Sequence, residues 1–180
     1  MDIKETAIEG CFILEPSPLR DDRGFFARSY CPNLLAQAGL SYPFQVCQEN
    51  ISFNERRGTL RGMHWQAAPV PDPKIIRAVK GALFDVVIDI RPQSKSYGKW
   101  VSAELTADNR KSLIVPPECA HGFLTLEDQT EAHYLMGAFY EADLARGLRW
   151  NDPAFGVKWP FEPSVISERD ASYPDHAQKV

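Results

Sequence analysis

The most constraining feature of this sequence is a series of short apolar runs that proline and glycine interrupt. The 180 residues include 14 prolines and 11 glycines, and the apolar runs between them are strand-sized. This spacing is typical of β-sandwiches and barrels. The segment 75–91, "IIRAVKGALFDVVIDIR", is rich in Ile and Val and predicts two strands around a turn at Lys80 and Gly81. We therefore expect an all-β fold.

Further elements are predicted along the chain. Residues 32–38 are expected to form a short peripheral helix, because proline suits the first helical position and Gly39 can end the helix in a left-handed conformation. The polar, proline-rich tail from about residue 160 is expected to fold back over the barrel as a loop. The remaining predicted strands are "VSAELT" (101–106), "SLIVP" (112–116), "HGFLTLE" (121–127) and "HYLMGAFY" (133–140).

Composition restricts the compartment and the partners. A length of 180 residues with 44% hydrophobic content fits a single domain over residues 1–180. The net charge of -4 gives no general attraction to nucleic acid or to anionic membranes, and the apolar runs are too short for a membrane helix. The four cysteines are scattered and no N-terminal leader is visible, so we expect a reduced, cytoplasmic protein.

Seven segments rich in polar and aromatic residues follow one another in a fixed order. They are "DDRGFFAR" (21–28), "QENIS" (48–52), "GTLRGMHWQ" (58–66), "KIIRAVKGALFDVVIDIR" (74–91), "VPPECAHGF" (115–123), "GLRWNDPAFGVKWP" (147–160) and "ISERD" (166–170). Together they resemble the signature segments of the dTDP-4-dehydrorhamnose 3,5-epimerase family over nearly the whole chain. The resemblance implies a cupin-type antiparallel β-barrel, or jelly roll, with a few short peripheral helices, usually assembled as a homodimer.

The resemblance also implies an activity. Members of this family are isomerases of deoxysugar biosynthesis that need no cofactor. The expected reaction is epimerisation at C3, C5 or both in a nucleotide-linked 4-keto-6-deoxyhexose, such as dTDP-4-dehydro-6-deoxy-D-glucose. Inversion of a carbon beside a ketone requires a base, a cation that stabilises the enolate, and an acid on the opposite face.

His64 and Asp170 suit the base and its partner. Imidazole has an unperturbed pKa of about 6.5, close to working pH, and the resemblance assigns the role of base to His64 in "LRGMH". It pairs His64 with Asp170 in "ISERD", a carboxylate that would fix the tautomer and stabilise the imidazolium. Taken alone, His64 is also compatible with a structural strand residue and Asp170 with a solvated surface charge.

The resemblance assigns the cation to Lys74 and the acid to Tyr134. An ammonium near the carbonyl oxygen would offset the charge of the enolate, whereas the structural alternative is an edge lysine that discourages strand pairing. Tyr140 lies six residues after Tyr134, so the two share a face of the barrel if the strand is continuous. The family counterpart of Tyr140 lines the site.

The nucleotide half of the substrate calls for arginine, because guanidinium groups bind diphosphate as forks. Arg23 and Arg61 match the family's phosphate and sugar contacts, and Gln48 and Asn50 match residues that line its pocket. Phe26 can offer an apolar face to the base or sugar, and Ser52 and His121 are expected to complete the lining. Arg28 stands where the family usually has glutamate. The arginine therefore replaces a hydrogen-bond acceptor with donors. This substitution leaves open a single-centre epimerase, or one acting on another carrier such as a CDP- or GDP-linked sugar.

Two other classes of protein share the expected architecture. Many cupins bind a metal through a His-x-His pair, a glutamate and a later histidine, but here the pair reads His64, Trp65, Gln66, and His121 would be a weak partner. We therefore expect no metal site. A non-catalytic sugar-binding module would keep the arginines and aromatics but would not need the four proposed catalytic residues together.

Overall fold

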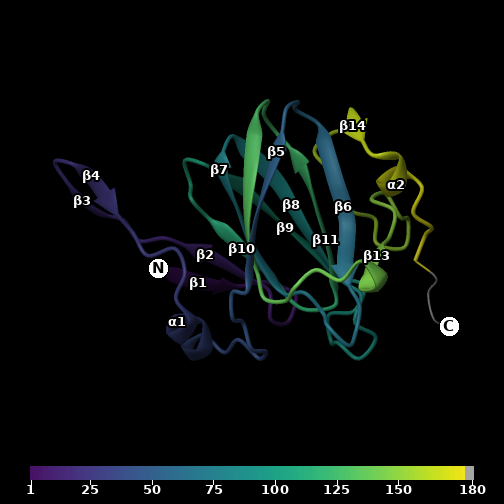
Figure 1. Ribbon diagram of the computed structural model, residues 1–180, viewed down its shortest axis with the longest axis horizontal. Helices are drawn as coiled ribbons and strands as arrows, with labels where there is room; N and C mark the ends of the chain where they lie inside the picture. The colour runs from purple at the N-terminus through teal and green to yellow at the C-terminus, as the bar shows by residue number, and fades with distance from the viewer. Residues whose placement is uncertain (177–180) are drawn as a thin grey trace.

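Two β-sheets pack face to face in the computed structural model, which describes residues 1–176 (Figure 1). One sheet has the order β1-β2-β10-β7-β12-β5, and the other has the order β13-β6-β11-β8-β9 with β14 paired to β6. The strands are β1 (Asp2–Glu5), β2 (Phe12–Glu15), β3 (Leu19–Asp21), β4 (Gly24–Phe26), β5 (Gln48–Asn54), β6 (Thr59–Gln66), β7 (Lys74–Lys80), β8 (Ala82–Asp89), β9 (Trp100–Thr106), β10 (Ser112–Val115), β11 (Cys119–Thr125), β12 (Thr130–Met136), β13 (Ala145–Gly147) and β14 (Val165–Ile166).

The helices of the described residues are short and lie outside the sheets. They are α1 (Pro32–Gln37), η1 (Ala142–Leu144) and α2 (Glu168–Ala171). Helix α1 begins at the predicted proline, and Gly39 follows its C-cap with a φ of 84°. None of the helices in residues 1–176 is long and apolar enough to cross a membrane. The expected all-β jelly roll with a few short peripheral helices is confirmed.

The predicted hairpin around Gly81 is present, and its second strand shows why its apolar run is continuous. Strand β7 ends at Lys80 and β8 begins at Ala82. Strand β8 lies between β11 and β9, and nearly all of its residues are buried. Its outer face packs against the segment 148–159, including Leu148 and Trp159. A strand covered on both faces loses the alternation of apolar and polar residues.

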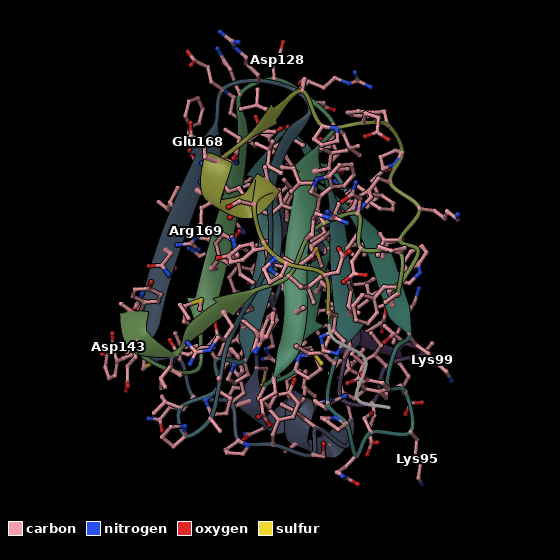
Figure 2. The ribbon with its side chains drawn as sticks, turned by 90° about the vertical axis from the view of Figure 1, so that its right-hand side faces the viewer. Lys95, Lys99, Asp128, Asp143, Glu168 and Arg169 are labelled. Atoms are coloured by element: carbon pink, nitrogen blue, oxygen red, sulfur yellow. The ribbon has the colours of Figure 1, made fainter. Side chains whose placement is uncertain are left out.

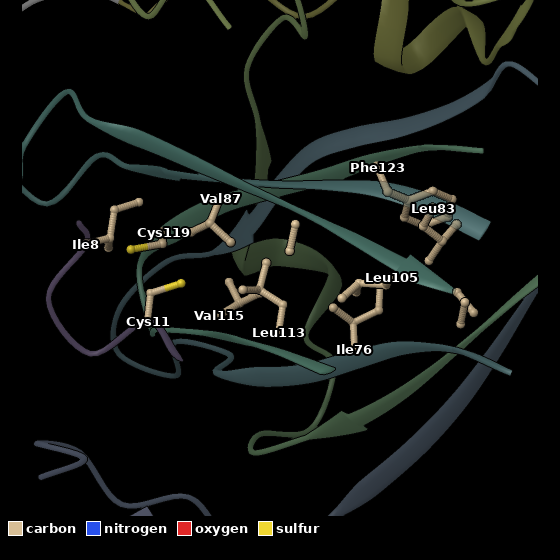
Figure 3. Packing of buried hydrophobic residues seen from close by; sticks show 13 residues of the cluster. Ile8, Cys11, Ile76, Leu83, Val87, Leu105, Leu113, Val115, Cys119 and Phe123 are labelled. Carbon is tan, nitrogen blue, oxygen red and sulfur yellow. The ribbon is translucent and has the colours of Figure 1, made fainter. Parts of the chain in front are cut away.

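The core between the sheets is a cluster of 13 buried residues, which Figure 3 shows from close by. Ile76 from one sheet and Phe123 from the other both belong to it. Burying each large aliphatic or aromatic side chain contributes about 1.5–3 kcal/mol. Cys11 and Cys119 also lie in this cluster, and burial raises the pKa of the Cys11 thiol to about 12. These two thiols therefore serve packing rather than nucleophilic chemistry.

The tail is more ordered than the expected loop. Val165 and Ile166 of β14 pair in parallel with Thr59 and Leu60 at the start of β6. Strand β13 pairs with the other end of β6, so β14 completes the pairing of backbone groups that β13 leaves free on this edge. Proline content and polarity favour a loop locally, but a partly paired strand edge decides the conformation. Residues 177–180 lie outside the described part of the chain.

Candidate active site

A cavity of about 530 Å³ opens between the two sheets beside the tail. Its lining residues are Ser52, Arg61, His64, Lys74, His121, Phe123, Tyr134, Ser167, Arg169 and Asp170. Seven of them were predicted from sequence, and the structure brings these together from five strands and α2. Phe123, Ser167 and Arg169 were not predicted. The latter two belong to the tail segment, which Figure 2 shows in front of the sheet that contains β6.

His64 and Asp170 form a hydrogen-bonded dyad. Nε2 of His64 lies 2.8 Å from Oδ1 of Asp170, and the N–H of Gly62 donates to Oδ2 at 3.1 Å. Ser167 caps α2 by accepting the Asp170 N–H at 3.1 Å, which fixes the helix that carries the carboxylate. Burial raises the pKa of Asp170, but the hydrogen bonds from His64 and Gly62 outweigh burial and leave the pKa below its ordinary value. The dyad therefore keeps an ionised carboxylate behind the imidazole.

Gly62 permits this geometry because it has no side chain. Its φ is 139°, and an added Cβ would lie 2.6 Å from Cα of Gly122 on β11. The backbones of β6 and β11 therefore approach closely beside the dyad. The same pair of strands places His121 opposite His64 in register.

A second dyad joins His121 to Asp85, a residue that sequence analysis did not identify. Nε2 of His121 lies 2.9 Å from Oδ1 of Asp85, whose side chain is fully buried on β8. Burial raises the pKa of Asp85, and the attraction of His121 opposes this rise. The signal was present as an aspartate within the apolar run "ALFDVVID", since a buried carboxylate requires a partner.

Lys74 enters the cavity already paired. Its Nζ lies 2.8 Å from Oδ2 of Asp72, and both side chains are largely buried. Asp72 also accepts the backbone N–H of Gln66 at 2.9 Å, which ties the pair to the end of β6. Lys74 is therefore not the exposed edge lysine of the structural alternative. Asp72 was not predicted, because a carboxylate in a proline-rich loop gives no sign of facing inward.

Tyr134 faces the two histidines from the opposite sheet. It lies on β12, in register with Ile76 of β7, and its ring meets that of His121 edge to face at a centroid separation of 6.3 Å. Burial, and then the nearby Asp85 carboxylate, raise the pKa of the Tyr134 phenol above its ordinary value. The phenol therefore remains protonated at neutral pH and is available as a proton donor.

Two guanidinium groups lie at the rim of the cavity. Arg61 donates from Nε to Oδ1 of Asn54 at 2.8 Å, so β5 orients this side chain. Arg169 is exposed, and its Nε lies 3.7 Å from Oδ1 of Asp170. Both residues are exposed, so the rim can bind an anionic group.

Three of the predicted contacts lie near the cavity but do not line it. Gln48 and Asn50 are on β5, and Nε2 of Gln48 donates to Oδ1 of Asn50 at 3.0 Å. The prediction that a continuous strand carries Tyr140 is wrong, because β12 ends at Met136. Tyr140 lies in the following loop, 63% exposed, and its backbone N–H donates to Oε1 of Gln48 at 3.4 Å. A local strand pattern gives no information on where pairing with the neighbouring strands stops.

The remaining three predicted residues are remote from the cavity of their own chain. Arg23 and Phe26 belong to the β3–β4 hairpin, which projects from the sheets at the side opposite α2, and Arg28 follows it (Figure 1). Arg23 pairs with Asp21 at 2.6 Å, and Phe26 is 77% exposed. One chain therefore does not bring these side chains to His64.

The potential metal ligands of the described residues are dispersed. In the described part of the chain, no three or more His, Cys, Asp or Glu side chains cluster in a way that would hold a metal ion. Each imidazole of the cavity is instead matched with one carboxylate.

Comparisons with known proteins cover nearly the whole chain and indicate one family. The sequence model of the family described as dTDP-4-dehydrorhamnose 3,5-epimerase matches residues 5–178. The chain is 41% identical to the dTDP-4-dehydrorhamnose 3,5-epimerase of Sinorhizobium fredii, covering 90% of this chain and 83% of that protein.

Two solved structures are similar in fold and sequence. The dTDP-4-dehydrorhamnose 3,5-epimerase of Bacillus anthracis, with TDP and PPi bound, superposes with a TM-score of 0.91 at 35% identity, covering 97% of this chain and 99% of that one. A 3'-monoepimerase from Streptomyces bikiniensis, in complex with dTDP-quinovose, superposes with a TM-score of 0.86 at 30% identity, covering 96% and 86%.

Proposed function

Because this chain belongs to the dTDP-4-dehydrorhamnose 3,5-epimerase family, we propose that it epimerises C3 and C5 of dTDP-4-dehydro-6-deoxy-D-glucose or a close relative. One observation carries the proposal: a carboxylate-backed imidazole, an ammonium and a protonated phenol surround one cavity. These groups are the base, the cation and the acid that inversion beside a ketone requires. All three are supplied by the chain itself.

His64 is the proposed base. An ionised carboxylate only accepts hydrogen bonds, so Nε2 of His64 carries the proton that it shares with Asp170, and Nδ1 keeps its lone pair. Nδ1 can then remove the proton from the carbon beside the ketone. Asp170 stabilises the imidazolium that results, since its charge lies within hydrogen-bond distance.

Lys74 and Tyr134 are proposed to complete the reaction. The ammonium of Lys74 offsets the negative charge that develops on the C4 oxygen as the enolate forms. Tyr134 then donates its proton to the carbanionic carbon. His64 and Tyr134 come from opposing sheets, so a sugar ring between them would meet the base on one face and the acid on the other.

The nucleotide diphosphate is proposed to lie across the rim of the cavity. Arg61 would contact the phosphates and His121 the sugar. Ser52 lies two residues from Asn50 and four from Gln48 on β5, so alternation places the three side chains on one face of the sheet. Together they offer polar contacts along the same path, with Tyr140 at its end.

A homodimer is proposed to supply the remaining contacts. Arg23, Phe26 and Arg28 are remote from their own cavity, and the exposed hairpin that presents them is suited to reach the cavity of a second copy. The outer face of the sheet also exposes Ile51 and Phe53 of β5. Large apolar side chains exposed on one face indicate an interaction surface.

Mixing two inactive variants tests the dimer. If the hairpin is exchanged, each cavity combines His64 of one copy with Arg23 of the other copy. A mixed dimer of Arg23→Ala and His64→Ala then has one cavity with both residues intact and one with neither. Random mixed dimers would then hold one intact site in half of the molecules, so about a quarter of the wild-type activity returns. Light scattering that reports a monomer, or mixing that restores nothing, would contradict the exchange.

The four free cysteines support our further proposal of a cytoplasmic setting.

The principal test is proton NMR in D2O with dTDP-4-keto-6-deoxyglucose, with deuterium at C3 and C5 followed separately. Incorporation at both positions is expected for the wild type, and none for His64→Ala. Incorporation at C3 alone would favour the single-centre alternative. The similarity to a 3'-monoepimerase is the reason for naming C3 as that centre. No incorporation at either position in the folded wild type would refute the assignment of substrate.

A further inference from the structure

The tail continues beyond Asp170 and packs behind the dyad. Tyr173, three residues after Asp170, presents its ring to that of His64 edge to face, with a centroid separation of 5.9 Å and an interplanar angle of 73°. The guanidinium of Arg169 lies 5.8 Å from the centroid of the same ring. Tyr173 is not a lining residue of the cavity, so it contacts the dyad from behind.

Gly147 forms the floor beneath this ring. It is paired with His64 in the register of β13 and β6. An added Cβ at Gly147 would lie 2.6 Å from Cε1 of Tyr173 and nearer still to two other ring carbons. Gly147 lies in a strand with an ordinary φ, so its backbone would accept alanine, and only the Tyr173 ring requires the missing side chain.

From this geometry we propose that Tyr173 is a positioning residue that wedges between Gly147 and His64 and holds Asp170 against the imidazole. The inference rests on the proposed function for its catalytic consequence, but not for its structural one. Helix α2 has only four residues, so a segment this short depends on contacts at both ends to keep one position. Ser167 anchors the start of α2, and Tyr173 is the first large side chain after its end.

The wedge has two physical effects. Its ring excludes water from the back of the dyad, which strengthens the hydrogen bond between His64 and Asp170 because solvent no longer competes. It also holds the guanidinium of Arg169 over its face, near the Asp170 carboxylate. Displacing the ring would loosen the base but leave Arg61, the proposed phosphate contact, in place.

A double-mutant cycle between Gly147 and Tyr173 tests the wedge. Gly147→Ala forces the ring out of its seat, and we expect kcat to fall on the order of 10- to 100-fold while KM stays within about twofold. Tyr173→Ala should cause a similar loss. Tyr173→Phe keeps the ring, so its kcat should stay near the wild-type value. In the double variant, Gly147→Ala should add nothing to the loss from Tyr173→Ala, because the atoms with which its methyl group would collide are absent.

Exchange of the Gly62 amide gives a readout that needs no substrate. This N–H donates to Oδ2 of Asp170, so its hydrogen exchange, measured by NMR, should accelerate at least about tenfold in Tyr173→Ala and Gly147→Ala. Tyr97→Ala is the matched control, because Tyr97 packs against His176 of the same tail at a centroid separation of 6.3 Å, away from the dyad. It should change neither kcat nor the Gly62 exchange.

The outcomes separate the wedge from the reaction. Unchanged Gly62 exchange in a folded Tyr173→Ala variant would overturn the wedge, as would an equal effect of Gly147→Ala with and without Tyr173. If Gly147→Ala does not fold, the two Tyr173 variants still test the wedge. Gly62 exchange and kcat should then change in Tyr173→Ala but not in Tyr173→Phe. Faster Gly62 exchange in a protein that does not act on the proposed substrate would support the wedge and refute the proposed function alone.

Discussion

Replacing Asp170 with asparagine should disable the proposed base without removing any packing. In the wild type, Oδ1 accepts from His64 and Oδ2 accepts from Gly62, so both positions require an acceptor. Asparagine offers one acceptor and one donor. If its NH2 faced Gly62, two donors would meet in a buried site, at a cost of about 1–3 kcal/mol.

The favoured arrangement therefore turns the amide NH2 toward Nε2 of His64. Nε2 must then accept, which moves the imidazole proton to Nδ1, the nitrogen that the mechanism requires to be free. A base held in the wrong tautomer typically lowers kcat by about 10³- to 10⁴-fold, which corresponds to about 4–5.5 kcal/mol of transition-state stabilisation. KM should change little, because Asp170 faces the imidazole rather than the nucleotide.

The assay is deuterium incorporation at C3 and C5 in D2O, followed by NMR under saturating substrate. Glu168→Gln is the matched control, since it makes the same acid-to-amide change at an exposed position on the same helix and should leave the rate unchanged. A rate for Asp170→Asn within about tenfold of the wild type would refute the tautomer argument. Loss of activity in both variants would instead indicate a general effect on α2.

Three further predictions concern other buried groups. Tyr134→Phe should retain deuterium incorporation but lose net inversion, as measured by NMR, and equal loss of both would remove the acid role from Tyr134. Asp72→Asn leaves the buried ammonium of Lys74 without its carboxylate, so the free energy of unfolding in urea should fall by about 3 kcal/mol, whereas no loss would mean that solvent reaches Lys74. Burial raises the pKa of Asp89, but hydrogen bonds from Arg91 and two serines outweigh burial and hold the pKa at about 2, against an ordinary value of 3.8. This difference corresponds to about 2.4 kcal/mol of stability. Since the folded pKa lies below the unfolded one, this stability is present above about pH 4 and is lost as pH falls toward 2. The difference in unfolding free energy between wild type and Asp89→Asn should therefore shrink over that range, and a constant difference would contradict the linkage.

The sequence by itself determined the local elements. Ile- and Val-rich runs around Gly81 specify two strands and a turn, because strand formation and reversal depend on neighbouring residues. The ordered family segments also carried His64 and Lys74, which the structure brings to one cavity. The end of β12 was missed, because where a strand stops depends on its pairing as well as on its own residues.

Only the tertiary structure decided which groups from distant segments of the chain meet. The partner of His121 is Asp85, 36 residues away, and their contact follows from the register of β11 against β8. The seating of Tyr173 on Gly147 likewise depends on how the tail crosses β13 and β6. The pattern along one strand records which side chains point inward but not which strand lies opposite. That choice is made when the sheets pack, since burying apolar faces and satisfying backbone hydrogen bonds are properties of the whole chain.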